Sequence, residues 1–530
     1  MKSKKIKITC IGISLIMCLS VVACSKTTKT NETASTTKGK PEVLEITKNM
    51  FFGDASDSPE LKSEFAQLFE KKYGIKLKVN ALPRNNYVEK VNLMVTSGEA
   101  KGILSLFGPP DVLKSIEDGT IEPLDDYLKD NKVWQSMPEE YKNLFKFDGK
   151  VWAFASRYNG SFFTRWYRQD WLDNLGLKAP NNVDELYEVA KAFTEKDPDK
   201  NGKKDTYGLT AAGTWNLQDI FQAFDARLDN TGSGSIAYDP NEDAWVDSML
   251  KPGMIDALKY INKMYANGYL DPEVFTNKGS TMREKIYSGK AGSTFYWASQ
   301  GYSIAEPEIK KTNPKGSIVE QLATSGKQTK NLNQMVMTGP PYVLLKGTKD
   351  PKEVVNTFIN TFFGEESGYL MGKMGIEGKT YKKEGNNIIW LKEPSADPAK
   401  GVTMGLPAIV DEIPKFPADK YPTITDGTDE EKKSSLELLD KLSKMKKDGL
   451  DKKLVFICPG NYDVILSKTY TEKQADISRV FQEVTTQAIM GKISAEEAVA
   501  NYIKSIKAYG GDKILEEANT SIGKTTKQKY

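Results

Sequence analysis

The order of secondary-structure patterns near the start of this chain constrains its fold most strongly. A short apolar strand pattern comes first, then apolar residues at helical spacing, then strict alternation of apolar and polar residues. A second helical pattern and a short apolar run follow. The predicted elements are strand, helix, strand, helix and strand at 43–46, 60–73, 75–79, 87–97 and 103–107. This β-α-β-α-β order predicts a parallel sheet with helices on its faces.

Similar patterns continue after Asp148. Strands are predicted at 152–155 and 162–167, and amphipathic helices at 254–266 and after two capping boxes. The boxes are Asn182 with Glu185 and Ser494 with Glu497. Since a chain of this length exceeds one domain, we expect an α/β fold in two lobes.

The composition excludes several classes of protein. The chain has 530 residues, 39% of them hydrophobic, with 74 basic and 71 acidic side chains and no histidine. This charge balance argues against a dedicated nucleic-acid binder. Without histidine, Ser-His-Asp and Cys-His catalysis and His-ligated metals are excluded, which moves the expectation from an enzyme toward a binding protein.

The N-terminus has the pattern of a secretory signal. Lysines precede an apolar stretch at 8–22 that is short for a membrane span and ends in Val-Val-Ala-Cys. This end resembles a bacterial lipobox, which implies removal of residues 1–23 and a diacylglycerol on Cys24; an ordinary secretory signal is the alternative. The polar stretch 24–41 is then a disordered tether. Cys458 would have no partner for a structural disulfide.

A loop at 197–205 has oxygen-bearing side chains at alternate positions. They are Asp197, Asp199, Asn201 and Asp205, and Gly202 stands where a calcium loop turns sharply. The carbonyl of Lys203 is a further candidate ligand. A bidentate glutamate is missing at the twelfth position, where Gly208 stands. We therefore expect a structural Ca²⁺ site, with a polar turn that binds no metal as the alternative.

Segments along most of the chain resemble one family. They include Asp148–Trp152, Arg168–Leu177, Asp197–Thr210, Leu258–Leu270, Ser288–Gly292 and the C-terminal stretch 491–518. The chain is similar to the family 1 extracellular solute-binding proteins of ABC transporters, especially LplA-type lipoproteins of Gram-positive bacteria.

The resemblance implies a type II periplasmic-binding-protein-like fold. Two hinged α/β lobes would close over a ligand in the cleft between them. We expect residues 42–155 and 305–365 in the first lobe, and 156–304 and 366–530 in the second. Related alginate-binding proteins hold calcium in a loop equivalent to 197–205.

Aromatic and polar side chains near the predicted strand ends would suit a sugar. Flat rings fit the C–H face of a sugar, and polar groups fit its hydroxyls. The candidate ligand-binding residues are Phe51, Asp54, Phe107, Tyr158, Asn159, Trp215, Tyr296 and Trp297. Phe107 could equally belong to the core, whereas Tyr158, Trp215 and Trp297 lie beside polar or glycine-rich loops. Arg168 could bind ligand or pair with Asp170, and we expect the pair.

These features together predict a monomeric lipoprotein on the outer face of the cell membrane. It would bind an oligosaccharide and deliver it to ABC permease subunits, with no catalytic residues and no nucleic-acid partner. One alternative is a secreted carbohydrate-active enzyme with carboxylates such as Asp54 and Asp111 as acid and base. Another is the same fold with a non-sugar solute such as a peptide.

Overall fold

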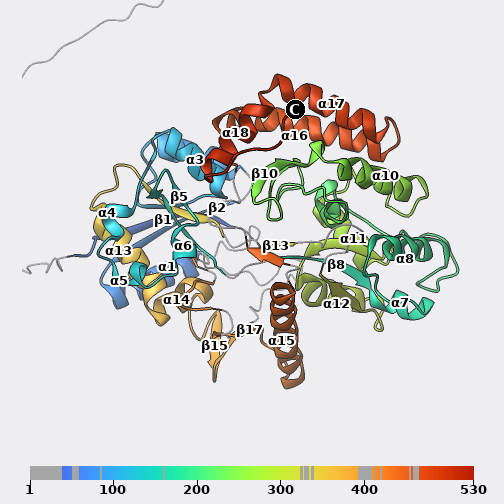
Figure 1. Cartoon of the computed structure of the whole chain (residues 1–530). Coiled ribbons are helices and arrows are strands. Elements are labelled where there is room, and N and C mark those ends of the chain that lie inside the picture. Colours follow the sequence, from blue (N-terminus) through green and yellow to red (C-terminus); the bar gives the residue numbers. More distant parts are fainter. Residues whose placement is uncertain are drawn as a thin grey trace, which may run out of the picture. The chain divides into compact units, whose positions relative to one another are not determined.

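The computed structural model of this chain (Figure 1) describes part of it in detail. The described residues are 39–50, 59–83, 86–158, 162–322, 326, 333–335, 339–391, 409–410, 412–417, 420–452, 455–457 and 465–530. The predicted signal peptide, Cys24, most of the tether and Cys458 lie outside them. Residues 41–530 form one compact unit, and the description below concerns this unit.

The first sheet confirms the predicted β-α-β-α-β order. Its opening elements are β1 (Val43–Met50), α1 (Pro59–Tyr73), β2 (Lys76–Pro83), α2 (Tyr87–Thr96) and β3 (Ile103–Ser105). Strand β1 lies between β2 and β3 and is parallel to both. Leu44 and Ile46 of β1 are fully buried, as are Phe65 and Phe69 on the inner face of α1. Burial of these two apolar faces against each other explains why the helix covers the sheet.

A strand from far along the chain completes this sheet. Strand β14 (Pro341–Leu345) pairs antiparallel with β3, β4 (Ile121–Glu122) and β7 (Ala153–Ala155). All five residues of β14 are buried, so the returning chain enters the interior of the sheet. Between β3 and β7 lie α3 (Pro109–Glu117), α4 (Asp125–Leu128), α5 (Lys132–Gln135), α6 (Glu139–Lys142), β5 (Lys146–Phe147) and β6 (Lys150–Val151).

A second, antiparallel sheet has the order β11-β8-β12. Its strands are β8 (Phe163–Arg168), β11 (Ser293–Trp297) and β12 (Ile318–Gln321). Elements near it in the sequence are α7 (Gln169–Leu175), α8 (Val183–Glu195), α9 (Gln218–Ala223), β9 (Ile236–Asp239), β10 (Ala244–Asp247), α10 (Pro252–Ala266), α11 (Gly279–Tyr287) and α12 (Glu306–Lys310). The central strand β8 is buried at every position, so both faces of this sheet are covered.

The C-terminal helices pack beside α10, as Figure 1 shows in red and green. They are α16 (Lys468–Ile489), α17 (Ala495–Ala508) and α18 (Gly511–Ser521). Both predicted capping boxes start helices: Asn182 accepts a hydrogen bond from the Glu185 N–H in α8, and Ser494 accepts one from the Glu497 N–H in α17. Capping satisfies N–H groups that have no partner within the helix.

Three clusters of buried side chains make up the interior. The first surrounds the sheet of β1, the second lies among α8, α10 and α16–α18, and a small third surrounds Trp166 and Tyr296. Two stretches join cores that also contain residues far from them in the sequence. Ile309 and Ile318 pack with Trp166, whereas described residues within 369–388 and 409–421 contribute to the first cluster. An amphipathic pattern shows that a face is buried but not against which core, so sequence alone could not place these stretches.

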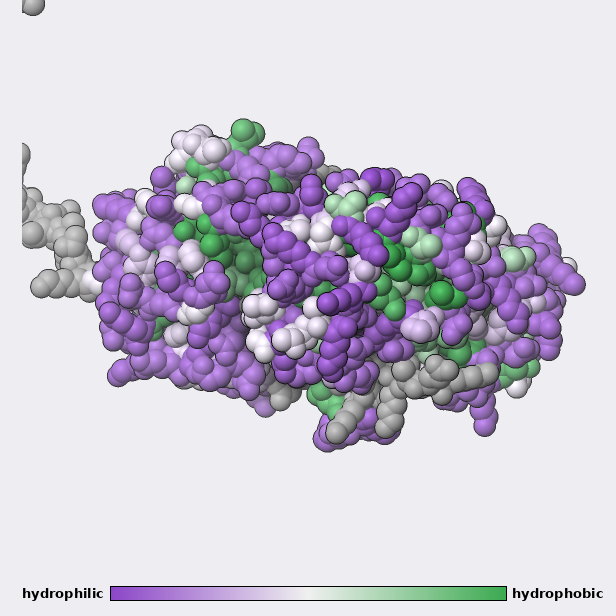
Figure 2. Space-filling view, turned by 45° about the horizontal axis from the view of Figure 1, so that its top comes forward, coloured by the Kyte–Doolittle hydropathy of each residue, from purple (hydrophilic) through white to green (hydrophobic). Residues whose placement is uncertain are grey.

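The remaining elements follow β14 or pair in small sheets. They are β13 (Asn333–Met335), α13 (Pro351–Ile359), α14 (Glu366–Met374), β15 (Tyr381–Glu384), β16 (Asn387–Trp390), β17 (Thr423–Thr425), α15 (Asp429–Asp451) and β18 (Val455–Ile457). The face in Figure 2 is mostly hydrophilic, and hydrophobic residues reach it in separate groups. Among the described helices, none has the length and apolar character needed to cross a bilayer.

Candidate functional site

Four aromatic rings meet where β8, β11 and the 3₁₀ turn Thr214–Leu217 come together. We call Phe163, Trp215, Tyr296 and Trp297 the aromatic cluster. The ring centroids of Phe163 and Trp297 are 4.1 Å apart, with 31° between the ring planes. Trp215 stands edge-on to Phe163 at 5.5 Å and to Tyr296 at 5.3 Å. The structure thus brings together three of the predicted ligand-binding residues.

Strand pairing explains how the cluster forms. In the antiparallel pair of β8 and β11, Phe163 lies opposite Trp297. Side chains of directly opposite residues share one face of a sheet, so these two rings meet there. Phe163 and Tyr296 are buried, whereas Trp215 and Trp297 are only partly buried. The two tryptophans therefore rest on a packed base and keep part of their surface accessible.

Two residues of this region were not predicted from the sequence. Phe163 lies in the predicted strand 162–167, but its role depends on the register with β11. Arg283 of α11 donates from Nη1 to the Tyr296 hydroxyl at 2.7 Å, and its guanidinium carbon lies 5.4 Å from the ring centroid of Tyr296. No local pattern singles out Arg283, because the contact depends on how α11 packs against β11.

Phe107 and Tyr158 belong to a different part of the molecule. Both pack against the first core: the Phe107 ring lies 5.1 Å from that of Tyr87, and the Tyr158 ring lies 5.6 Å from that of Tyr141. Burial raises the pKa of the Tyr158 hydroxyl. The structure therefore separates these two candidates from the aromatic cluster in their packing.

Of the carboxylates Asp54 and Asp111 considered for an enzyme, the structure describes only Asp111. Phe51, Asp54 and Asn159 lie outside the described residues. Asp111 accepts a hydrogen bond from the Gly108 N–H at 3.1 Å at the start of α3, and burial raises its pKa. Its carboxylate thus has a structural role in capping a helix.

The loop 197–205, which we call the acidic loop, is held by its own side chains. Asp197 accepts hydrogen bonds from the Asn201 and Gly202 N–H groups, each at 3.0 Å. The Asn201 amide donates to Asp199 at 2.8 Å and to Asp205 at 3.2 Å, and its oxygen accepts from the Lys203 N–H at 2.7 Å. The loop is thereby folded into the tight turn that its sequence predicted.

The donor set of the acidic loop fits a hard cation. One oxygen of Asp199, Oδ1, is buried and has no hydrogen-bond partner among the described residues. Burial, together with the nearby carboxylates of Asp197 and Asp205, raises the pKa of Asp199. The Lys290 ammonium, 2.6 Å from Asp205, lowers the pKa of that carboxyl. The loop thus concentrates negative charge around an unsatisfied oxygen, as a calcium ligand set does.

The arrangement of side chains in the loop is not that of a closed metal site. Within the described ranges, no group of three or more His, Cys, Asp or Glu side chains is placed to hold a metal ion. The Asn201 amide nitrogen stands between two carboxylates, and it would have to turn its oxygen inward to join them as a ligand.

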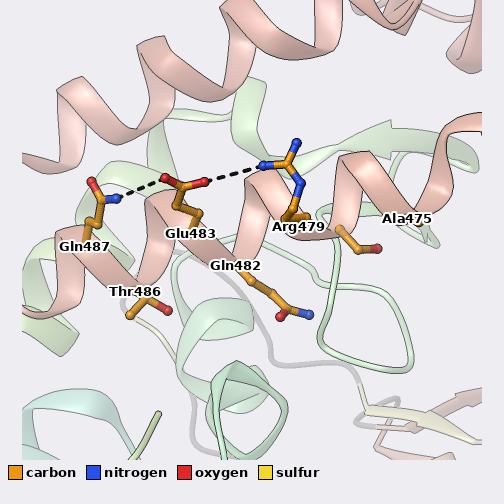
Figure 3. A pocket seen from close by; sticks show the side chains of 7 residues that line it. Ala475, Arg479, Gln482, Glu483, Thr486 and Gln487 are labelled. Atoms are coloured by element: carbon orange, nitrogen blue, oxygen red, sulfur yellow. Dashed lines mark hydrogen bonds and ion pairs between the residues drawn. The ribbon is translucent and has the colours of Figure 1, made fainter. Parts of the chain in front are cut away.

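A hollow on α16, shown in Figure 3, lacks the features expected of a sugar site. It is lined by Ala475, Ser478, Arg479, Gln482, Glu483, Thr486 and Gln487. These positions recur at helical spacing on one face of one helix, and no aromatic ring is among them. Glu483 is already in contact with Arg479 at 3.7 Å and with Gln487 at 3.3 Å. The aromatic cluster is therefore the better candidate for ligand binding.

Known proteins resemble this chain along nearly all of its length. Residues 54–369 match the family described as bacterial extracellular solute-binding protein. Lipoprotein LipO of Bacillus subtilis is 26% identical over 510 residues, which span 92% of this chain and 94% of LipO. The fructooligosaccharide ABC transporter substrate-binding protein FusA of Streptococcus pneumoniae is 26% identical over 233 residues, or 40% of this chain and 43% of FusA.

Solved structures share the fold. An HMO binding, ABC-transporter-associated solute-binding protein from Bifidobacterium longum infantis aligns with a TM-score of 0.67 at 17% identity, over 91% of this chain and 98% of that protein. The alginate-binding protein AlgQ2, solved without calcium ion, aligns with a TM-score of 0.66 at 18% identity, over 92% and 98%. At these identities the likeness concerns the fold alone, which is that of two-lobed solute-binding proteins.

Proposed function

Since this chain belongs to the bacterial extracellular solute-binding proteins, we propose that it captures an oligosaccharide and delivers it to the permease of an ABC transporter. The aromatic cluster carries this proposal. Trp215 and Trp297 offer ring surface beside a buried base, and aromatic faces suit the C–H faces of sugar rings. The names of FusA and of the HMO-binding protein support a sugar as the ligand.

The proposed cycle uses two lobes, each built on one of the large cores. The first lobe holds the sheet of β1, and the second holds β8 with the C-terminal helices. Ligand would favour a closed arrangement of the lobes, because a ligand shifts an equilibrium toward the state that it binds better. The permease would then distinguish loaded from empty receptors. Phe107 and Tyr158 would contribute from the first lobe, and the aromatic cluster from the second.

Calcium is the proposed ion of the acidic loop. Asp197, Asp199, Asn201, Asp205 and the Lys203 carbonyl would hold it, and the missing glutamate leaves further positions to water. The unsatisfied Oδ1 of Asp199 supports this proposal, as does the shared fold with AlgQ2, a protein whose calcium-free form was solved as such. The ion would stabilise the loop and take no part in chemistry.

The location follows from the N-terminal sequence. We place the protein outside the cell, held at the membrane by lipid on Cys24, with the following polar residues as a tether. The match to a lipoprotein over most of the chain supports this assignment. A tether raises the effective concentration of the receptor near its permease.

Isothermal titration of the purified chain against a panel of oligosaccharides tests the proposed function. We expect heat of binding with at least one glycan, a stoichiometry of one per monomer, and unchanged glycan on recovery by chromatography. Binding of a peptide in place of any glycan would contradict the sugar ligand, and release of shorter glycans would contradict a binding protein.

A further inference from the structure

Two Arg–Asp pairs, one buried and one partly buried, lie on opposite faces of β8. Arg165 and Arg168 are three positions apart, so their side chains leave the strand on different sides. Arg168 binds Asp170 through two hydrogen bonds, at 2.8 and 2.6 Å, as the sequence predicted. Arg165 binds Asp219 of α9 in the same two-armed way, and neither side chain of that pair is accessible to solvent. The two pairs invite a comparison of what each one holds in place.

The pair at Arg165 reaches the segment that carries Trp215. Its Nη2 donates to the backbone carbonyl of Asn216 at 3.4 Å as well as to Asp219. Asp219 lies in the first turn of α9, directly after the 3₁₀ turn. The ion pair therefore connects the central strand of the second sheet to both ends of the short stretch 216–219.

The side chain of Asn216 fixes the same turn from the other side. Its amide donates to the Phe295 carbonyl of β11 at 2.7 Å, and its oxygen accepts from the Ala212 N–H at 2.9 Å. Asn216 is fully buried, whereas the adjacent Trp215 is only partly buried. Trp215 is thus the least buried member of a turn whose neighbouring residue is anchored to β8 and β11.

Stability alone does not explain the ion pair. Removing two charges from water costs free energy that their attraction recovers only in good geometry, and apolar residues of similar volume often serve as well. The buried Nη1 of Arg165 lacks a hydrogen-bond partner among the described residues, which adds to the cost. What apolar side chains could not supply is the directed contact with the Asn216 carbonyl.

We propose that Arg165 and Asp219 are positioning residues, which set the orientation of Trp215 in the ligand site without touching the ligand. The proposal rests on the proposed function in one respect only, namely that Trp215 contacts the sugar. The Arg165–Asp219 pair fixes the 3₁₀ turn, and the turn sets the orientation of the Trp215 indole. The indole then packs edge-on against Phe163 and Tyr296. By contrast, Arg168 extends to the Ile286 carbonyl at 3.4 Å, at the end of α11.

The test replaces each pair by apolar residues in the full chain, purified in detergent and labelled with fluorotryptophan. The two variants are Arg165→Met with Asp219→Leu, and Arg168→Met with Asp170→Leu as the matched control. The ¹⁹F resonance that disappears in Trp215→Phe identifies Trp215 among the eight tryptophans. We expect the first variant to shift or broaden this resonance and to bind oligosaccharide about tenfold more weakly. The control variant should fold and leave both readouts unchanged.

The outcomes separate the positioning role from the proposed function. An unchanged Trp215 resonance in a folded Arg165/Asp219 variant would overturn the positioning role, as would an equal shift in the control. If the wild-type chain binds no glycan, the proposed function fails, and the ¹⁹F comparison still decides whether the pair orients the ring. If the double variant does not fold, Arg165→Lys decides: it keeps a charge beside Asp219 and removes the Nη2 contact with the Asn216 carbonyl, so an unmoved Trp215 resonance there would also refute the role.

Discussion

The aromatic cluster and the acidic loop are built on opposite principles. The cluster is formed by strands and a turn that pack on a core, so its shape exists before any ligand arrives. The acidic loop is a surface turn whose carboxylates bind the Asn201 amide and the Lys290 ammonium. Packing therefore fixes the shape of the aromatic cluster, whereas the balance of charges fixes that of the acidic loop. Removal of a ligand should therefore affect the acidic loop more than the cluster.

Calcium should give the largest effect, and it acts on the acidic loop. At free calcium about 100 times the dissociation constant, binding to the folded state alone adds about 2.7 kcal/mol to the free energy of unfolding. Thermal unfolding with calcium or with a chelator measures this difference. Asp199→Asn should abolish it, whereas Lys290→Ala should preserve or enlarge it by freeing Asp205. If calcium stabilises Asp199→Asn as much as the wild-type chain, calcium does not bind at the acidic loop.

Loss of a ring should act on ligand affinity. Trp297→Ala removes a partly buried ring that rests on Phe163, and we expect binding to lose about 2 kcal/mol, or about thirtyfold in affinity. Titration calorimetry measures the change. Trp390→Ala is a matched control, because Trp390 is a partly buried tryptophan that packs on the first core. Equal losses of affinity in both variants would mean that the cluster is not the sugar site.

A glycine beside Trp215 gives a smaller effect. Gly232 has φ +64°, and a Cβ there would lie 2.5 Å from the Trp215 Cα. Gly268 has φ +71° with open space around a Cβ, so Gly268→Ala is the matched control. Each substitution should cost about 1–2 kcal/mol of stability for its backbone conformation. Only Gly232→Ala should also weaken oligosaccharide binding. Equal affinities of the two variants for the oligosaccharide would show that the turn carrying Trp215 tolerates displacement.

The smallest effect is a pH dependence next to the cluster. Glu320 accepts hydrogen bonds from the Thr164 hydroxyl and from the Ser299 and Tyr302 N–H groups, and burial raises its pKa above the usual 4.5. A carboxyl with a raised pKa holds its proton more tightly when folded. Its contribution to the free energy of unfolding is therefore fully present below pH 4.5, the ordinary pKa of the carboxyl in the unfolded chain. This contribution is lost as the pH rises through the pKa of the folded state.

Glu320→Gln should remove this slope, because an amide does not titrate in this range. Chemical unfolding of both proteins at several pH values above about 4.5 measures the slopes. Parallel pH profiles for the two proteins would show that Glu320 does not titrate differently on folding.

Local pattern predicted much of the fold and only part of the site. The parallel strands β1, β2 and β3, their helices and both capping boxes follow from residues close in sequence. The insertion of β14 beside β3 does not, because antiparallel pairing with a distant strand depends on tertiary packing. The same reason hides Phe163 opposite Trp297, and the contact of Arg165 with Asp219, which joins residues 54 positions apart.

A crystal structure of the complex with the tightest-binding oligosaccharide would show whether the aromatic cluster binds the sugar. We expect a sugar ring stacked on Trp215 or Trp297. A glycan bound away from both tryptophans, such as in the hollow of α16, would contradict this expectation.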